Sequence, residues 1–302
     1  MDGWGLGKVK SSDAIQHAKT PFVSSLYTKY PNSTLVTCGE DVGLPEGQMG
    51  NSEVGHLNLG AGRIVYQELQ RINVAIKTGE FAANETLLAA IDFAKQNNKP
   101  LHLIGLVSDG GVHSHTSHLK ALTSLCAAQG LSNVLIHAFT DGRDTDPKSG
   151  LGFLTDLQNH LEKSTGSIAT VTGRYYAMDR DKRWERVKLA YDGMANGIGL
   201  KTTDILGAVK KSYEEDVTDE FIKPIINSNL QNSSIKDGDV VICFNFRTDR
   251  CREITQVLTQ TDFPDFGMQK INLHYTTMTQ YDQTYKKVNV VFENDDLKNT
   301  LG

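Results

Sequence analysis

Short apolar runs that end in polar, charged loops recur through the middle of this chain, and they constrain its fold more than any other feature. Residues 101–107 are almost continuously apolar, as in a parallel strand that is buried on both faces. A polar loop and a helical pattern over residues 118–128 follow. The same succession begins again at strands predicted over residues 133–140, 167–172 and 240–246. This alternation predicts an α/β fold with a mainly parallel sheet.

Other segments fit the same plan. Apolar spacing predicts helices, and β-branched or apolar runs predict strands. The helices are expected over residues 21–30, 63–76, 150–161 and 184–194, and the strands over 34–38 and 271–277. Residues 198–234 are more polar and predict a helix with long loops. In a parallel sheet, ligands bind at the carboxyl ends of the strands, so the polar loops mark the expected site.

Composition excludes several classes of partner. Lys+Arg 31 minus Asp+Glu 36 gives −5, which offers no bulk attraction for nucleic acid. No apolar run approaches the roughly 18 residues that a membrane span needs, and no signal peptide precedes the first motif. The four cysteines form no CxxC pair, which favours free thiols in a reducing cytoplasm.

The segment of residues 50–63, GNSEVGHLNLGAGR, is the most informative motif. Gly-Asn before Ser52 predicts a tight turn that places this serine at the start of a short helix, where free N–H groups stabilise a phosphate or an oxyanion. A hydroxyl there can attack phosphorus and hold the phosphoryl group as an ester. The plainer interpretation is that Ser52 only caps the helix. Four glycines and His56 in the same segment suggest backbone packed closely against a ligand or another segment.

Arginines gather at the predicted strand ends, although the chain as a whole is acidic. They are Arg143, Arg174, Arg180, Arg183, Arg247, Arg250 and Arg252. The guanidinium fork binds carboxylate or phosphate through two hydrogen bonds, so several converging forks indicate a small ligand with more than one anionic group. The alternative is that about half of them only form surface ion pairs with Asp144, Asp179, Asp181 and Asp249.

Two further features of the loops bear on chemistry. His113, His115 and His118 are candidate metal ligands, but an ordinary polar loop with one functional histidine is the preferred interpretation. Asp144 follows Arg143 directly, and an arginine neighbour favours the ionised carboxylate. Such a carboxylate near a sugar-like hydroxyl can act as a general base, and as an acid on the return step.

Six motifs in this order resemble one known family. They are MDGWG, GNSEVGHLNLGAGR, SDGGVHSH, DGRDTDP, GRYYAMDRD and NFRTDRCRE. Together they resemble the cofactor-independent, or 2,3-bisphosphoglycerate-independent, phosphoglycerate mutases of the alkaline phosphatase superfamily. The resemblance covers essentially the whole chain.

The resemblance implies an α/β fold with two domains. Residues 1–65 would be the N-terminal part of an alkaline-phosphatase-like catalytic domain. Residues 66–293 would be an inserted α/β domain that binds phosphoglycerate, and residues 294–302 would begin the returning catalytic domain. The family continues beyond this point, so the chain is expected to be a fragment with little or no activity by itself, and to be monomeric when complete.

The resemblance also implies a function and a set of residues. The family interconverts 3-phosphoglycerate and 2-phosphoglycerate in glycolysis and gluconeogenesis through a phosphoserine intermediate. Ser52 matches the nucleophile and Asp144 the proton shuttle. The substrate-binding positions are His113, Arg143, Asp144, Arg174, Arg180, Arg247 and Arg250. Asp2 and Ser52 match ligands of two divalent metal ions, usually Mn²⁺, whose other ligands would lie beyond Gly302.

Two other functions remain open from the sequence. One is another enzyme of the same superfamily, a phosphatase or a phosphopentomutase. The other is a non-catalytic anion-binding module made of the inserted domain alone.

Overall fold

The structure is a computed structural model that describes residues 4–293 and 297–301. The chain forms two compact units. Unit 1 comprises Met1–Arg71 with Asp296–Gly302, and unit 2 comprises Ile72–Asp295. Each is described by itself. The roles that the sequence assigns to residues 1–65, 66–293 and 294–302 stay predictions.

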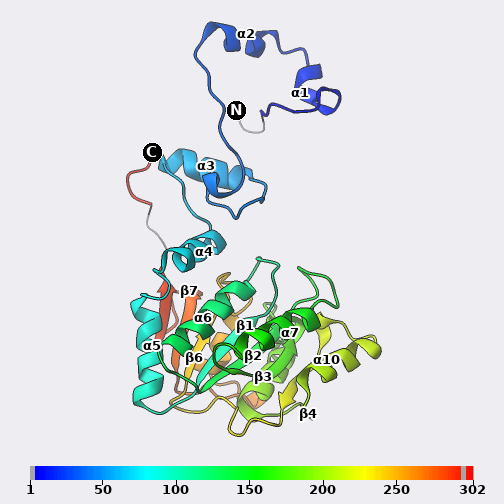
Figure 1. Ribbon diagram of the computed structural model, residues 1–302, viewed down its shortest axis with the longest axis vertical. Coiled ribbons are helices and arrows are strands. Elements are labelled where there is room, and N and C mark those ends of the chain that lie inside the picture. The colour runs from blue at the N-terminus through cyan, green and yellow to red at the C-terminus, as the bar shows by residue number, and fades with distance from the viewer. Residues whose placement is uncertain (1–3, 294–296, 302) are drawn as a thin grey trace. The chain divides into compact units, whose positions relative to one another are not determined.

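Unit 2 is built on one eight-stranded sheet (Figure 1), in the order β4-β5-β3-β2-β1-β6-β7-β8. The strands are β1 (Leu101–Leu106), β2 (Val134–Thr140), β3 (Ser167–Gly173), β4 (Leu200–Thr202), β5 (Ile225–Asn227), β6 (Val240–Cys243), β7 (His274–Thr279) and β8 (Val288–Phe292). All neighbours pair in parallel except β3 and β5. The predicted α/β fold with a mainly parallel sheet is confirmed.

The path of the chain reverses at the centre of this sheet. From β1 it proceeds outward to β2 and β3, and later returns to the other side of β1 as β6, β7 and β8. Leu106 near the end of β1 is in register with Phe139, and Ile104 with Cys243. Connections therefore leave β1 and β6 in opposite directions, which opens a crevice at the carboxyl ends of the strands.

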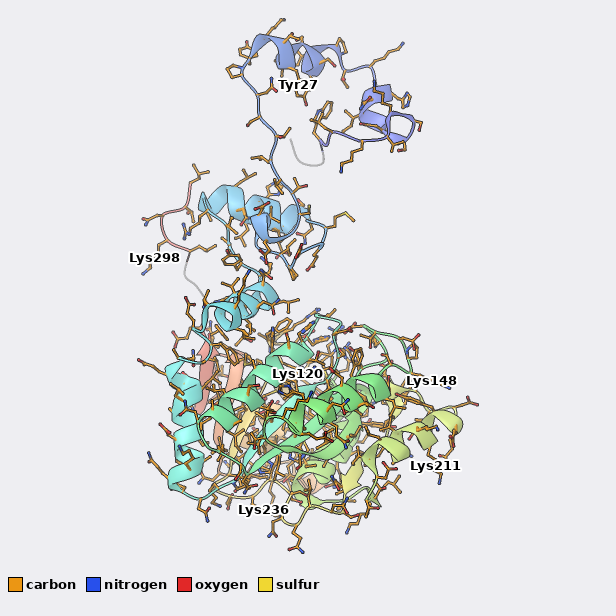
Figure 2. The ribbon with its side chains drawn as sticks, viewed as in Figure 1. Tyr27, Lys120, Lys148, Lys211, Lys236 and Lys298 are labelled. Atoms are coloured by element: carbon orange, nitrogen blue, oxygen red, sulfur yellow. The ribbon has the colours of Figure 1, made fainter. Side chains whose placement is uncertain are left out.

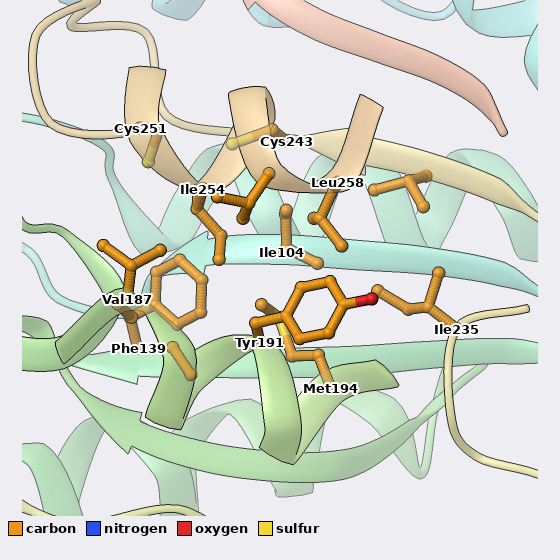
Figure 3. Packing of buried hydrophobic residues seen from close by; sticks show 14 of the residues in the cluster. Ile104, Phe139, Val187, Tyr191, Met194, Ile235, Cys243, Cys251, Ile254 and Leu258 are labelled. Atoms are coloured by element: carbon orange, nitrogen blue, oxygen red, sulfur yellow. The ribbon is translucent and has the colours of Figure 1, made fainter. Parts of the chain in front are cut away.

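Helices cover both faces of the sheet. On one face, α9 (Trp184–Tyr191), a π-helical turn at Asp192–Asn196 and α11 (Arg252–Thr259) pack against apolar side chains of β1, β2 and β6 (Figure 3). On the other lie α6 (Thr116–Ala128) and α7 (Gly150–Leu161), in front of the sheet in Figure 1, with α5 (Glu85–Gln96) and α10 (Ile205–Glu214) beside them. Lys120 on α6 (Figure 2) is paired with Asp156 on α7 at 2.5 Å.

One face of the sheet also carries a buried polar chain. His102 Nδ1 lies 2.9 Å from His137 Nε2, and His137 Nδ1 lies 3.0 Å from the Thr170 hydroxyl. His102 Nε2 lies 3.4 Å from Asp239 Oδ2, a carboxylate that only accepts. The protons therefore run one way, from Thr170 through both neutral imidazoles to Asp239. Burial lowers the pKa of both histidines.

Some predicted elements differ from the structure. Residues 34–38 are exposed and form no strand; within the described part only Cys38 pairs, in a single bridge with Met49. A β-branched run without a hydrogen-bonding neighbour does not form a strand. The helix predicted over 63–76 is α4 (Glu68–Thr78), and β6 ends three residues before the predicted Phe246. The sequence patterns had not revealed α5, β4, β5 or β8.

Unit 1 contains less buried structure. Its main helices are α1 (Ala14–His17), α2 (Pro21–Lys29) and α3 (Ser52–Ala61), and Tyr27 on α2 (Figure 2) accepts a hydrogen bond from the Trp4 indole. Val42, Leu44 and Val54 form its small core cluster.

Candidate functional site

The carboxyl ends of four neighbouring strands in unit 2 bring together most of the predicted site residues. His113 follows β1, the 141–144 loop follows β2, and Arg174 begins the short helix α8 (Arg174–Ala177) directly after β3. Arg247 and Arg250 follow β6. These loops meet at the place where the order of the strands reverses, so the fold itself places the site there.

Arg174 joins three of these loops. Its guanidinium is buried, and Nη1 donates to Asp141 Oδ1 at 2.6 Å and to Asp144 Oδ2 at 2.5 Å. Nη2 donates to His113 Nε2 at 2.9 Å. Burial opposes the charge, but the hydrogen bonds with Asp144 and Asp141 outweigh it and raise the pKa of Arg174. Arg174 therefore orders the site more than it faces solvent.

Asp141 is a site residue that the sequence analysis did not single out. Its side chain is buried, and it accepts hydrogen bonds from Ser108 at 2.8 Å and from the N–H groups of Arg143 and Asp144. Burial would raise the pKa of Asp141, but these donors and Arg174 outweigh it and lower the pKa. The position at the end of β2, as the first residue of DGRDTDP, was the available signal.

His113 is neutral and has a defined tautomer. Because arginine can only donate, the bond from Arg174 fixes Nε2 as the acceptor and places the proton on Nδ1. Burial, and then the charge of Arg174, lowers the pKa of His113 to about 4. Nδ1 lies 3.6 Å from Asp249 Oδ1, and both atoms are buried with no hydrogen-bond partner among the described residues. A hydroxyl beside both atoms can accept from Nδ1 and donate to Oδ1.

The remaining arginines surround the same point with their guanidinium groups partly open to solvent. The side chains of Arg143, Arg180 and Arg247 are 55%, 46% and 49% exposed. Arg180 and Arg247 both contact Asp249, at 2.9 and 3.3 Å, and Arg143 lies 3.5 Å from Glu220.

The pKa of Arg250 shows that these cations lie close to one another. Burial, and then the charges of Arg174, Arg180 and Arg143, lowers the pKa of Arg250. A site in which cations destabilise one another is one that an anion stabilises. The alternative that the arginines pair with acidic neighbours holds in part, because Asp249 forms ion pairs with Arg180 and Arg247. These pairs nevertheless lie together at the strand ends and are not spread over the surface.

A buried carboxylate holds the 141–150 loop. Asp219 accepts from the Gly150 N–H at 2.8 Å and from the Tyr213 hydroxyl. Gly142, at φ +68°, approaches Asp219 so closely that an added Cβ would lie 2.9 Å from the Asp219 Cβ. Glycine is needed at this position both for its left-handed backbone and for the space.

Ser52 lies in unit 1, where the structure places it at the first residue of α3, as predicted. The interpretation that Ser52 caps the helix is wrong, because the cap is Asn51, whose side chain accepts from the Val54 N–H at 3.0 Å. Ser52 Oγ lies 3.1 Å from His56 Nδ1, which also lies 2.8 Å from the Ser52 carbonyl. A carbonyl only accepts, so Nδ1 carries a proton and is not a base for this hydroxyl.

The four glycines of residues 50–63 differ in whether their surroundings require a glycine. An added Cβ on Gly50 would lie 1.7 Å from the Thr37 carbonyl oxygen, so this glycine permits a close approach of two backbones, as expected. Gly55, Gly60 and Gly62 have no such neighbour within 4 Å among the described residues.

No metal site is formed by the residues that the structure describes, since no three His, Cys, Asp or Glu side chains there are grouped to hold an ion. His115 caps α6 through the Ser117 N–H, and His118 is buried against Asn73, so the histidine-cluster alternative is wrong. Of the two predicted ligands, Asp2 lies outside the described residues and Ser52 does not fit a metal without further partners.

The fold and the strand ends define an α/β protein with a cluster of arginine side chains at the carboxyl edge of its sheet. A family model described as "BPG-independent PGAM N-terminus" matches residues 72–283. The chain therefore belongs to the family of 2,3-bisphosphoglycerate-independent phosphoglycerate mutases.

Individual relatives carry that name. The whole chain is 55% identical to a 2,3-bisphosphoglycerate-independent phosphoglycerate mutase of Flavobacterium johnsoniae and 50% identical to one of Clostridium perfringens. It spans 60% of the length of each. A solved structure of Leishmania mexicana phosphoglycerate mutase, determined at low cobalt concentration, matches 99% of the chain with a TM-score of 0.74 and 32% identity, and the match covers 58% of that protein.

In the described part of the chain, no helix is long and apolar enough to cross a bilayer.

Proposed function

We propose that this chain provides the substrate-binding part, and a portion of the catalytic part, of an enzyme that interconverts 3-phosphoglycerate and 2-phosphoglycerate through a phosphoserine. The observation that carries the proposal is the group of partly exposed arginines around His113, Asp144 and Asp249. Phosphoglycerate has a phosphate, a carboxylate and a hydroxyl, which matches several guanidinium forks, one neutral imidazole and one carboxylate.

Each group has a proposed role in holding the substrate. Arg143, Arg180, Arg247 and Arg250 bind the phosphate and the carboxylate. Arg174 holds Asp144 and His113 in place through the bonds described above. Because the clamp uses several separate contacts, the glycerate can stay bound while its phosphoryl group is absent.

Transfer of the phosphoryl group uses two residues of the chain. Ser52 Oγ gives up its proton and forms the new P–O bond as the bond to the glycerate oxygen breaks, and that oxygen takes up a proton and remains as a hydroxyl. The free N–H groups at the start of α3 stabilise the phosphoryl oxygens. On return, Asp144 takes the proton of the other glycerate hydroxyl, whose oxygen then accepts the phosphoryl group from Ser52. The hydrogen bond that Arg174 Nη1 donates to Asp144 Oδ2 at 2.5 Å holds this carboxylate in place for the step.

The proposal extends to the organisation of the chain. We assign residues 1–65 and 294–302 to the catalytic domain and residues 66–293 to the inserted substrate domain. Two divalent ions, Mn²⁺ by preference, would use Asp2 and Ser52 with ligands from outside this chain. The protein would be monomeric and cytoplasmic.

A chimera tests the reaction. The chain replaces the matching 60% of the Flavobacterium johnsoniae relative, and ³¹P NMR follows 3-phosphoglycerate with the wild-type chimera, with Ser52→Ala and with Ser25→Ala, a matched serine on α2. We expect 2-phosphoglycerate without free phosphate from the wild type and from Ser25→Ala, and none from Ser52→Ala.

Three results would contradict the proposal. Free phosphate without 2-phosphoglycerate would indicate a phosphatase. Full activity of Ser52→Ala would exclude the phosphoserine. Tight binding of phosphoglycerate by the wild-type chimera without any product would favour a binding module.

A further inference from the structure

Two segments that carry site arginines are hydrogen-bonded to each other. One is residues 178–183, after α8, and the other is residues 247–253, which lead into α11. The Arg250 guanidinium donates to the Met178 carbonyl at 3.3 Å, and Arg180 donates to Asp249 at 2.9 Å. Both contacts use arginines that the proposed function assigns to substrate. A third contact does not, and it comes from a buried carboxyl group.

That group is Glu253 in the first turn of α11. Its side chain is buried, and Oε1 accepts from the Lys182 N–H at 2.9 Å. Lys182 is held at φ +56°, a left-handed conformation that is unfavourable for a residue with a Cβ. The Lys182 peptide therefore needs a fixed partner to stay in this position, and Glu253 supplies it.

The surroundings of the second oxygen of Glu253, Oε2, indicate whether this side chain carries a proton. Oε2 is buried and no donor among the described residues reaches it; the group it faces is the buried carboxyl of Asp179. The Asp179 oxygens accept from the N–H groups of Asp181 and Arg183, both at 2.9 Å, and from Arg186 at 3.3 Å. Two carboxyl groups can hydrogen-bond to each other only if one of them carries a proton. Asp179 is already served by three donors, so the proton belongs on Glu253.

We infer that Glu253 is a positioning residue, protonated when the site is formed, which donates to Asp179 and thereby fixes the segment that carries Arg180. This inference rests on the proposed function for the role of Arg180. It assigns a task to a residue that does not touch the substrate.

The surroundings make this proton easy to lose near neutral pH. Burial, followed by Asp179 and Asp181, raises the pKa of Glu253 to about 7. The other charged or titratable groups that face this cluster are Arg186 on α9, which pairs with Asp179, and Arg252 and Tyr285. Ionised Glu253 would face ionised Asp179 in a buried place, and like charges there repel. As pH rises through about 7 the hydrogen bonding between the two segments should therefore weaken.

Calorimetry of the 302-residue chain with 3-phosphoglycerate tests this, in the wild type, in Glu253→Gln and in Glu253→Ala. Glutamine keeps both the acceptor and a donor without a titrating proton. The control is Glu185→Gln, the same change at an exposed first-turn carboxylate of α9. The phosphate of the ligand titrates in the same way with both proteins. Its effect on affinity therefore cancels in the ratio of the wild-type affinity to the Glu253→Gln affinity. A second readout is the hydrogen-exchange protection of the Lys182 amide by ¹⁵N NMR without ligand.

The expected results follow from the protonated fraction. At pH 6 the affinities of the wild type and Glu253→Gln for 3-phosphoglycerate should agree within about twofold. At pH 8 the wild type should bind it about tenfold more weakly than Glu253→Gln does. Glu253→Ala should bind weakly at both, and Glu185→Gln should follow the wild type. Lys182 protection should fall with rising pH in the wild type and in Glu185→Gln, but not in Glu253→Gln. A constant affinity ratio with constant Lys182 protection would overturn the inference. If no variant binds phosphoglycerate, the proposed function fails, and Lys182 protection alone decides. Protection that is independent of pH in the wild type overturns the inference, and a fall with pH in the wild type and Glu185→Gln that is absent from Glu253→Gln supports it.

Discussion

The Nδ1 of His113 lies 3.6 Å from Oδ1 of Asp249, and both atoms are buried without a hydrogen-bond partner in the described part of the chain. Nδ1 carries a proton and Oδ1 accepts, yet the separation is too long for a direct bond. A hydroxyl beside both atoms would accept from Nδ1 and donate to Oδ1, which also lies 3.3 Å from Arg247 Nε. The pair is therefore suited to a ligand group that both accepts and donates.

His113 should titrate far below an ordinary histidine. Burial and the charge of Arg174 lower its pKa to about 4, so the imidazole NMR signals should titrate with a midpoint near that value. Asp249→Asn should lower the midpoint further, because the Asp249 charge favours the protonated ring. Bound phosphoglycerate should raise it for the same reason. A midpoint at the ordinary histidine value in the free protein would contradict this.

The stability of the fold should fall in acid. The folded state lowers the pKa of His113, His118, His102 and His137, mainly through burial. An unfolded chain binds those protons at about pH 6.5, so folded-state stability is fully present above that pH and is lost as pH falls toward 4. Urea unfolding at several pH values measures it. Stability that stays constant between about pH 7 and pH 4 would contradict the four buried neutral histidines.

Two arginines should behave in opposite ways. Arg174→Met leaves Asp141 buried without its cation and should destabilise the chain by about 3–5 kcal/mol. Arg143→Ala removes a half-exposed side chain and should change stability by less than about 0.5 kcal/mol, while weakening phosphoglycerate binding about ten- to hundredfold. Urea unfolding and calorimetry separate the two effects. Equal loss of stability in both variants would remove the distinction between an ordering and a ligand-binding arginine.

Two threonines on β3 form a matched pair. Thr170 donates to His137, whereas the buried Thr172 hydroxyl has no partner among the residues described. Thr170→Val should therefore cost about 1–3 kcal/mol, and Thr172→Val should be neutral or stabilising. If the two variants unfold at the same urea concentration, the polar chain across the sheet contributes no net stability.

Chelation should leave substrate binding intact. The described residues of unit 2 form no metal cluster, and the arginines that we propose to bind the anion need no metal ion to do so. The affinity of the chain for 3-phosphoglycerate should be the same within about twofold with EDTA and with added Mn²⁺. Binding that requires the metal would place an ion in the substrate site, against this account.

The sequence predicts the central sheet well for a physical reason. The strands β1, β2 and β3 are buried on both faces, and continuous apolar runs such as 101–107 are typical of such strands. The edge strands β4 and β8 are partly exposed, and β4 and its neighbour β5 have only three residues each, so their sequences lack that signal. The strand expected over 34–38 had the right composition but no neighbour within the described residues.

The site was predictable as a set of loops but not as a network. Strand-end arginines are visible in the sequence, and the structure brings Arg174, Arg180, Arg247 and Arg250 together. Which carboxylate each one meets depends on side-chain contacts between segments far apart in the chain. Arg143 was expected to act on adjacent Asp144, but Arg174, 30 residues away, makes that bond. Glu253 gave no signal because an acidic residue in a helix's first turn is ordinary.

The most direct test of the central claim is calorimetric titration of the 302-residue chain with 3-phosphoglycerate, D-glycerate and inorganic phosphate at one fixed salt concentration. The arginine site should bind one phosphoglycerate, and each ligand that lacks the phosphate or the carboxylate should bind at least about tenfold more weakly. Arg247→Ala should reduce the preference for phosphoglycerate. Equal affinity for phosphoglycerate and inorganic phosphate, or no binding to a folded chain, would contradict the account.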